Sequence, residues 1–429
     1  MTAYVARPDP SPPGSRRIIY WLLCRSIRYP GLLRAVGSVF RAWPALLGGR
    51  WVARRSAVEH VLRRPDSFSN ASHAPNLVAG DFLIGMEPGA QYDADHALFK
   101  SVLAGLQEQP GADREAIARS AALRDSGAQP FDLVEDYLMW VVLRALEPAF
   151  GAAAEPVLAG THRHRPDHAL ERRYMHDVRH VAAHLFGGDT APADVQRRAE
   201  VCGATLAARI HGGLPELSMS WPAPGAQLAD LKRNAIGLAW VSHPVTVQGG
   251  ALVVQELLGR PGVYRALRAQ ATRLGDEVWT DAGFRASVRG HVLELMRFRP
   301  VFPALSRVVP REAELETGAR RNPVRPAGSS VGLMTLAALF DCRATPDAQR
   351  YCPMRGKPPG GPPQPWQMLM FGGGVRQCPA SDQALTILTS AVIGLLTLPE
   401  LGWADRWGRR IGYDGPMIAR MNLRLQATP

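Results

Sequence analysis

The chain has 429 residues, of which 50 are Lys or Arg and 38 are Asp or Glu, so its formal net charge at pH 7 is +12. A chain of this length can bury a sizeable hydrophobic core, and no linker divides it. We expect a disordered tail over residues 1–15 and one folded domain over residues 16–429. The positive charge is not accompanied by any motif that reads DNA or RNA, so no nucleic-acid partner is expected.

The segment 16–50 alternates arginines with large apolar residues, a basic amphipathic pattern. Its first apolar run, residues 18–24, ends at Arg25, is far too short to span a bilayer, and lacks a signal-peptide cleavage site. Two interpretations remain open. The segment forms the first helices of the fold, which the interruptions at Pro30 and Pro44 favour, or it makes a peripheral contact with an anionic membrane surface.

Cysteine usage and apolar periodicity indicate the compartment and the fold class. The five cysteines are odd in number and scattered, without metal-ligand spacing, which indicates a reducing environment and a cytoplasmic protein. Between residues 130 and 300, apolar residues recur at helical spacing. We therefore predict a mainly α protein with small β-sheets.

Three histidines, His176, His180 and His184, recur at every fourth residue, which places them on one face of a helix. This spacing can chelate a metal ion, but no carboxylate or cysteine is seen to complete a tetrahedral site. A role facing solvent or lining a pocket is the favoured interpretation. Further histidines lie just upstream, at positions 162, 164 and 168.

Residues 371–380, Phe-Gly-Gly-Gly-Val-Arg-Gln-Cys-Pro-Ala, carry the strongest signal, and they follow a Pro-rich insertion at 357–365. The glycines allow a tight, bare turn, and an apolar run of helical character, residues 384–396, comes next. A thiolate at Cys378 would lie at a helix N-terminus, which stabilises negative charge, and Pro379 fits the first helical turn. A bare turn with one cysteine lets a flat metallated macrocycle approach, with sulfur as its axial ligand.

This loop resembles the haem-thiolate loop of cytochromes P450, in the spacing of its Phe, Gly, Arg and Cys. A Gly-rich loop around a buried structural cysteine is the alternative. That alternative is disfavoured because other segments resemble the family in the same order along almost the whole chain. These segments are residues 51–69, 95–100, 294–297, 326–341 and 351–355. The resemblance implies the cytochrome P450 fold.

The resemblance also implies a cofactor, haem b (iron protoporphyrin IX), with Cys378 as the axial ligand of the iron. Phe371 is implied to pack near the sulfur and to limit its hydrogen bonding. The two haem propionates need charge-assisted partners. By resemblance those partners are His96, Lys100, Arg307 and Arg376.

Glu294 and Arg297 are three residues apart, so on a helix their side chains share a face and can form an ion pair. Such a pair alone is a weak signal. Its position about eighty residues before the cysteine matches the family's Glu-x-x-Arg pair. In the family an arginine of the following meander, here Arg355, joins the pair. We therefore expect a structural network behind the haem, with no catalytic role.

The long central helix departs from the family. Typical members carry Ala/Gly-Gly-x-acid-Thr, a run that kinks the helix and relays protons for dioxygen activation. The matching residues 241–246 here read Val-Ser-His-Pro-Val-Thr, without the glycine or the acid, although Pro244 would itself bend the helix. His243 and Thr246 are the candidate catalytic residues. His243 would serve as an acid–base group or as a clamp for a substrate carboxylate, or it is a core histidine with no special role.

Three functions stay open. The leading one is a monooxygenase acting on a small apolar molecule, a lipid or natural product, with electrons from an acidic ferredoxin or a flavin reductase. The second is a peroxide-driven peroxygenase or a hydroperoxide-rearranging enzyme, which members lacking the acid–alcohol pair often are. The third is a non-catalytic haem-binding protein. The basic surface would also suit an acidic carrier domain.

Overall fold

The computed structural model describes Ile18, Trp21, Cys24, Arg25 and residues 27–107, 111–127, 129–153, 169–214, 221, 227–355, 369–404 and 411–426. The expected tail at 1–15, the Pro-rich insertion at 357–365 and the histidines at 162, 164 and 168 lie outside these residues. Helices dominate the described residues and the sheets are small, so the predicted mainly α class is confirmed.

The α-helices among the described residues are α2 (Pro30–Ala42), α3 (Arg55–Leu62), α4 (Ala90–Gln107), α5 (Gly111–Asp125), α6 (Met139–Leu146), α8 (Ala169–Gly187), α9 (Ala193–Gly212), α11 (Leu228–Gly237), α12 (His243–Leu258), α13 (Pro261–Leu274), α14 (Ala282–Phe298), α15 (Thr335–Leu339) and α17 (Ser381–Leu396). Shorter turns that matter below are η1 (Pro44–Leu47), η2 (Ala71–Asn76), η3 (Leu133–Leu138), η4 (Glu147–Ala153), η6 (Leu238–Ser242) and η8 (Gly374–Arg376).

Three small sheets accompany the helices. One has the strand order β1-β6-β3, with β6 parallel to β1 and antiparallel to β3, and it comprises β1 (Trp51–Val52), β3 (Leu305–Val308) and β6 (Ser330–Leu333). A second is built on the long strand β9 and comprises β2 (Phe131–Asp132), β7 (Leu401–Trp403), β8 (Ile411–Asp414) and β9 (Met417–Leu425). The third pairs β4 (Ala313–Glu314) with β5 (Val324–Arg325).

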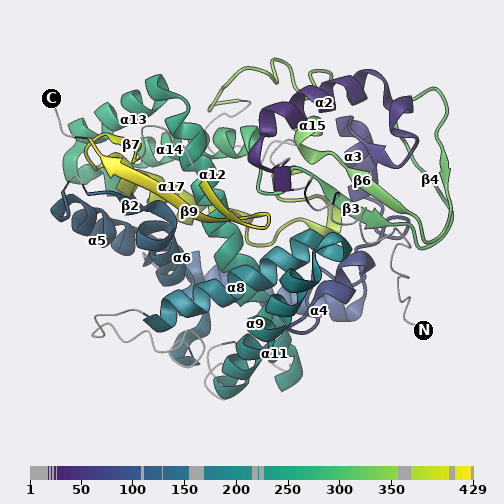
Figure 1. Cartoon of the computed structure of the whole chain (residues 1–429), viewed down its shortest axis with the longest axis horizontal. Coiled ribbons are helices and arrows are strands. Elements are labelled where there is room, and N and C mark those ends of the chain that lie inside the picture. The colour runs from purple at the N-terminus through teal and green to yellow at the C-terminus, as the bar shows by residue number, and fades with distance from the viewer. Residues whose placement is uncertain are drawn as a thin grey trace.

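A continuous helical rod formed by α11, η6 and α12 runs through the middle of the molecule (Figure 1). Most residues of η6 and α12 are buried, because this stretch is largely apolar. Pro244 lies at the second position of α12 and has no N–H to donate to the preceding turn. The wider π-helical turn of η6 directly before it accommodates this loss, so the rod is irregular where the sequence predicts a bend.

The N-terminal helix α2 has two apolar faces. Its inner face packs on the fold, and Gly37 lies so close to α15 that a Cβ there would be 2.5 Å from the Cβ of Ala337. Its outer face leaves Leu32 and Trp43 more than half exposed, at 67% and 62%. Among the described residues, no helix combines the length and apolar character that crossing a membrane requires.

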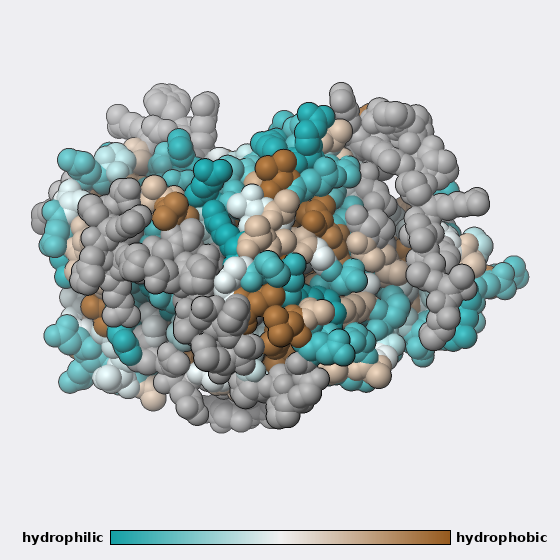
Figure 2. Space-filling model, turned by 90° about the horizontal axis from the view of Figure 1, so that it is seen from below, coloured by the Kyte–Doolittle hydropathy of each residue, from teal (hydrophilic) through white to brown (hydrophobic). Residues whose placement is uncertain are grey.

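The opposite face of the molecule differs in how its exposed apolar residues are distributed. Seen from below, where α9 and α11 come forward, the surface mixes hydrophilic residues with small hydrophobic patches (Figure 2). The exposed apolar residues of α2 and η1 instead recur at helical spacing along one stripe.

Candidate active site

Cys378 lies in a tight loop three residues before α17. Its backbone N–H donates to the Phe371 carbonyl oxygen at 2.7 Å, which closes the loop on itself. Gly374 has φ of +64°, and a Cβ there would lie 2.6 Å from the Leu62 carbonyl oxygen, so the turn requires glycine. The helix after the cysteine is present, but Pro379 lies in the turn before Ser381. The expectation that it occupies the first helical turn was wrong.

Burial decides the charge of this cysteine. Burial raises the pKa of the Cys378 thiol to about 11, and the hydrogen bond from the Ala380 N–H only partly opposes this. The helix N-terminus expected to stabilise a thiolate is therefore outweighed by desolvation. At neutral pH the thiol keeps its proton unless a metal ion binds the sulfur, because a coordinating thiol is deprotonated.

Two buried arginines meet beside the loop with too little negative charge around them. Arg307, on β3, is buried, and its burial together with the neighbouring Arg376 lowers its pKa to about 10. Arg376 has its side chain 6% exposed, and none of its three side-chain nitrogens has a hydrogen-bond partner among the described residues. Glu87, itself 48% exposed, is the nearest acid, 3.5 Å from Arg376 Nη2. Such a cluster fits a ligand that brings carboxylates.

The other two expected propionate partners lie on α4. His96 is half-buried, and its ring stacks on Tyr92 at a centroid distance of 5.7 Å. Tyr92 in turn donates its hydroxyl to the Val375 carbonyl oxygen at 2.9 Å and lies under the Arg376 guanidinium. The structure thus brings His96 to the edge of the arginine cluster. Lys100, one turn further along α4, is exposed and lowers the pKa of His96, although burial lowers it more.

Sequence reasoning missed three residues of this cluster: His73, Glu87 and Tyr92. Burial, reinforced by Arg307 and Arg376, lowers the pKa of His73 to about 4, so this ring is neutral at pH 7. His73 and Glu87 come from the connection between α3 and α4, which has no periodic pattern to reveal its path. Tyr92 could have been identified from the sequence, because it lies four residues before His96 and therefore on the same face of α4.

The three residues of the expected ion-pair network lie together. Arg297 is fully buried and binds both carboxylate oxygens of Glu294, at 2.9 and 2.8 Å. It also donates to the backbone carbonyl oxygens of Leu339, Ala348 and Arg350. Arg355 lies 3.6 Å from Glu294 and donates to the carbonyl oxygens of Pro346 and Asp347 and to that of Arg350, which Arg297 also binds. The Glu294–Arg297 pair is satisfied within the protein, whereas Arg355 Nε has no hydrogen-bond partner among the described residues; the closed pair suits a structural role.

His243 is the first residue of α12 and is completely buried. Its Nδ1 lies 3.0 Å from the Ala239 carbonyl oxygen and 3.2 Å from the Tyr174 hydroxyl, and its ring stacks on Phe150. Burial lowers the pKa of His243 to about 4, so the ring is neutral at pH 7. With its proton on Nδ1, Nε2 is left as an acceptor, and no group satisfies it. Thr246, one turn later, is also buried.

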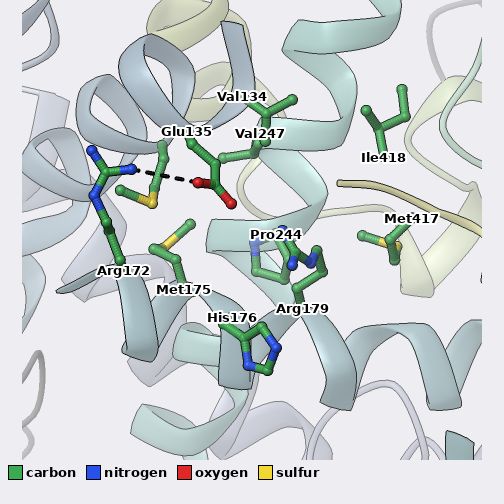
Figure 3. Close-up of a pocket in the computed structure, with 11 residues that line it drawn as sticks. Val134, Glu135, Arg172, Met175, His176, Arg179, Pro244, Val247, Met417 and Ile418 are labelled. Carbon is green, nitrogen blue, oxygen red and sulfur yellow. Dashed lines mark hydrogen bonds and ion pairs between the residues drawn. The ribbon is translucent and has the colours of Figure 1, made fainter. Parts of the chain in front are cut away.

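Pro244, the second residue of α12, lines a pocket between α8, α12, η3 and β9 (Figure 3). The pocket is small, with a cavity volume of about 40 Å³. Its charged lining is mostly basic, from Arg172, His176 and Arg179 of α8, while Glu135 is held by Arg172 at 3.4 Å. The basic side chains of α8 therefore face an apolar proline.

An aromatic wall, which the sequence did not reveal, lies between α4 and the rod. Phe82 packs edge-on against Trp240 of η6 and Phe99 of α4, with ring centroids 6.0 and 5.6 Å away. A Cβ at Gly237 would lie 1.9 Å from the Phe82 ring, so the absence of a side chain there makes room for it. The wall offers an apolar surface on the α4 side of the rod.

No protein-family model and no curated protein sequence matches the chain. Solved structures do. A cytochrome P450, P450BioI in complex with an acyl carrier protein carrying hexadec-9Z-enoic acid, matches with a TM-score of 0.70 and 12% identity, covering 94% of this chain and 100% of that one. CYP105P1 in complex with filipin I matches at 0.66 and 19%, covering 88% and 90%. The open form of cytochrome P450 EryK from S. erythraea matches at 0.64 and 18%, covering 88% and 91%. The resemblance inferred from the sequence is confirmed at the level of the fold.

We expect Arg297→Ala to prevent stable folding, because it leaves the buried Glu294 carboxylate without its bidentate partner. Removing one member of a buried pair costs about 3–5 kcal/mol. Urea unfolding followed by circular dichroism measures the loss. Arg289→Ala is a matched control on the same helix, because Arg289 pairs with the exposed Asp382. A stable Arg297→Ala protein with an altered product profile would instead assign this arginine a role in the reaction.

Proposed function

From the cytochrome P450 fold that the chain shares with these structures, we propose that it is a haem-thiolate oxidoreductase with haem b as its cofactor. The observation that carries the proposal is the juxtaposition of Cys378, in its glycine turn, with two buried arginines whose charges are met only in part by the half-exposed Glu87. A cofactor that presents two carboxylates on a flat ring would supply the missing charge.

The residues present fit that cofactor. Cys378 would be the axial thiolate, and Phe371 would shape the cover over its sulfur. Arg307 and Arg376 would hold the propionates, with His96 and Lys100 completing the positive rim and His73 adding a neutral hydrogen-bonding group. When bound, the haem would supply the oxidative chemistry. The protein would supply a buried binding site whose positive charges match the propionates.

We propose monooxygenation of a small apolar molecule, a lipid or natural product, as the reaction. The aromatic wall of Phe82, Phe99 and Trp240 supports an apolar substrate, because it offers ring surface and few polar groups. The net charge of +12 supports an acidic partner, either an electron donor such as a ferredoxin or flavin reductase, or an acidic carrier domain. All five cysteines are unpaired, which supports a reducing compartment such as the cytoplasm.

A second candidate, a peroxide-driven or hydroperoxide-rearranging enzyme, is favoured by the central helix. Residues 241–246 lack the acid of the family's run, and among the described residues nothing hydrogen-bonds to Nε2 of the neutral His243. A buried acceptor of this kind can take a proton from a bound hydroperoxide. The oxidant therefore separates the two candidates.

The test of the haem-thiolate proposal is the spectrum of reduced protein under carbon monoxide. We expect a Soret band shifted to the red, as a thiolate ligand produces, and we expect Cys378→Ala to lose it. Cys352→Ala is the matched control, because Cys352 lies outside the loop and only its backbone N–H takes part in the ion-pair network. A red-shifted band that survives in Cys378→Ala would overturn the assignment. Arg376→Ala should keep the band but lose haem faster to an acceptor globin.

The test of the oxidant compares hydrogen peroxide with a reductase system on a panel of lipids and aromatic compounds. If His243 is the acid–base group, His243→Ala should slow peroxide-driven turnover by a factor of about 10²–10⁴ with haem content unchanged. Val245→Ala, at a half-buried position two residues along the same helix, separates a local role of the histidine from a general disturbance of α12.

The same experiment has a pH signature. Because burial holds the pKa of His243 at about 4, the ring stays neutral at any higher pH. Turnover that uses it as a base should be flat from neutral pH down to about pH 5 and fall below that. Robust reductase-driven activity that His243→Ala leaves intact would favour the monooxygenase and make His243 a bystander.

We also propose that the outer face of α2 and η1 contacts an anionic membrane surface. Leu32, Val36, Val39, Trp43 and Leu46 are all exposed and fall three or four residues apart, on one stripe. The sequence has no Asp or Glu between residues 10 and 58 but has nine arginines there, which gives the stripe a charge complementary to anionic lipid.

We expect the protein to sediment with vesicles containing phosphatidylserine and much less with phosphatidylcholine alone. Trp43→Ser should weaken this binding by about tenfold, since a buried aromatic contributes about 1.5–3 kcal/mol. Val201→Ser, an equally exposed apolar position on α9, is the control and should have no effect. Equal binding of both vesicle types, or unchanged binding by Trp43→Ser, would contradict the proposal.

A further inference from the structure

The helices α8 and α9 bring together three side chains with metal-ligating atoms, away from the cysteine loop. They are His176 and Asp177 of α8 and Cys202 of α9, and one ligand atom from each lies within 4.8 Å of the other two. Cys202 Sγ is 3.5 Å from Asp177 Oδ1, and His176 Nδ1 is 3.6 Å from the same oxygen. The sequence indicated that nothing completes a site around His176. The fold supplies both the carboxylate and the cysteine.

We propose that these three residues bind one zinc ion, with water in the fourth position. Zinc takes sulfur at about 2.3 Å and nitrogen or oxygen at about 2.0–2.2 Å in a tetrahedron, which sets its ligand atoms about 3.3–3.6 Å apart. The separations of Asp177 Oδ1 from the other two atoms are of this size before any ion is present. Donors of nitrogen, oxygen and sulfur together suit zinc better than magnesium or calcium.

The surroundings of His176 leave the correct nitrogen free for the metal. His176 Nε2 lies 2.9 Å from His180 Nε2, and His180 Nδ1 lies 3.2 Å from Asp414 Oδ2 on β8. Asp414 accepts the Nδ1–H of His180, so His180 Nε2 accepts the Nε2–H of His176. The lone pair of His176 Nδ1 then points to Asp177 and Cys202. A metal-bound histidine ordinarily donates its second N–H to such a partner.

The two oxygens of Asp177 have separate tasks. Oδ1 faces His176 and Cys202, while Oδ2 lies 3.5 Å from Arg209 Nη2, and the residue is buried. Arg173 and Arg198 also lie near the thiol, so the site is otherwise electropositive. The carboxylate and the thiolate bring two negative charges that balance the ion. The thiol proton leaves to solvent when zinc binds.

Zinc here would fasten three elements, α8, α9 and, through Asp414, β8. The helix α8 also carries Tyr174, which contacts His243 in the central rod. An ion on α8 would therefore restrict the motion of the helix that covers the candidate catalytic histidine. The proposal does not depend on haem, because none of its residues belongs to the cysteine loop.

The test uses the full-length protein, stripped with a chelator and titrated with zinc chloride by calorimetry. We expect one ion per chain with a Kd of about 1 μM or below. Asp414→Asn, which removes only the support of His180, should weaken binding about 10–100-fold. Cys202→Ser should weaken it at least as much. His211→Gln, an exposed histidine at the end of α9, should leave it unchanged.

Zinc-edge X-ray absorption on the wild-type protein makes the test independent of whether variants fold. It should show one sulfur and three lighter ligands at the zinc. No saturable binding, a zinc shell without sulfur, or Asp414→Asn with wild-type affinity would each overturn the site. Cys378→Ala should bind zinc as the wild type does, so failure of the haem proposal and failure of this one are distinguishable.

Discussion

The bidentate pair between Arg297 and Glu294 holds the part of the chain that leads to the cysteine loop. Arg297 reaches three carbonyl oxygens between residues 339 and 350, and Glu294 accepts the Cys352 N–H at 2.8 Å. These bonds fix an irregular segment with little secondary structure of its own to the buried end of α14. In a low-dielectric interior the hydrogen bonds of such a network polarise and strengthen one another. If one of them is lost, water does not replace it. The pair therefore anchors residues 339–352 to α14.

Buried arginines gather in two places in the molecule, and the protein neutralises their charge to different extents. At Arg297 the charge is met by a carboxylate and a set of carbonyl oxygens, so the protein satisfies it alone. At Arg307 and Arg376 it is left almost unmet. A buried arginine whose charge is met by protein groups costs little free energy of folding. A buried arginine without such partners destabilises the folded state until a ligand supplies the missing charge. The second arrangement is therefore typical of a binding site and the first of a scaffold.

The sequence predicted what local pattern encodes. The glycine turn, Cys378, the helix after it and the Glu294–Arg297 pair all depend on residues a few positions apart. Tertiary packing determined the rest. Desolvation outweighed the helix dipole at Cys378, and the surroundings of His243 depend on a π-turn that no periodicity signals. Asp177 and Cys202 are 25 residues apart and meet only because α8 and α9 pair. His73 and Glu87 reach the arginine cluster along an unpatterned connection.

The raised pKa of Cys378 has a consequence for the life of the newly folded chain. Thiolates, not thiols, react with peroxides and alkylating agents, and their reaction with peroxide can proceed to irreversible acids. A cysteine whose pKa is about 11 is almost wholly in the unreactive form in a neutral cell. The sulfur is therefore unreactive toward peroxides and alkylating agents before any metal binds it. The burial that shapes the loop thus also protects the thiol from oxidative damage in the newly folded chain.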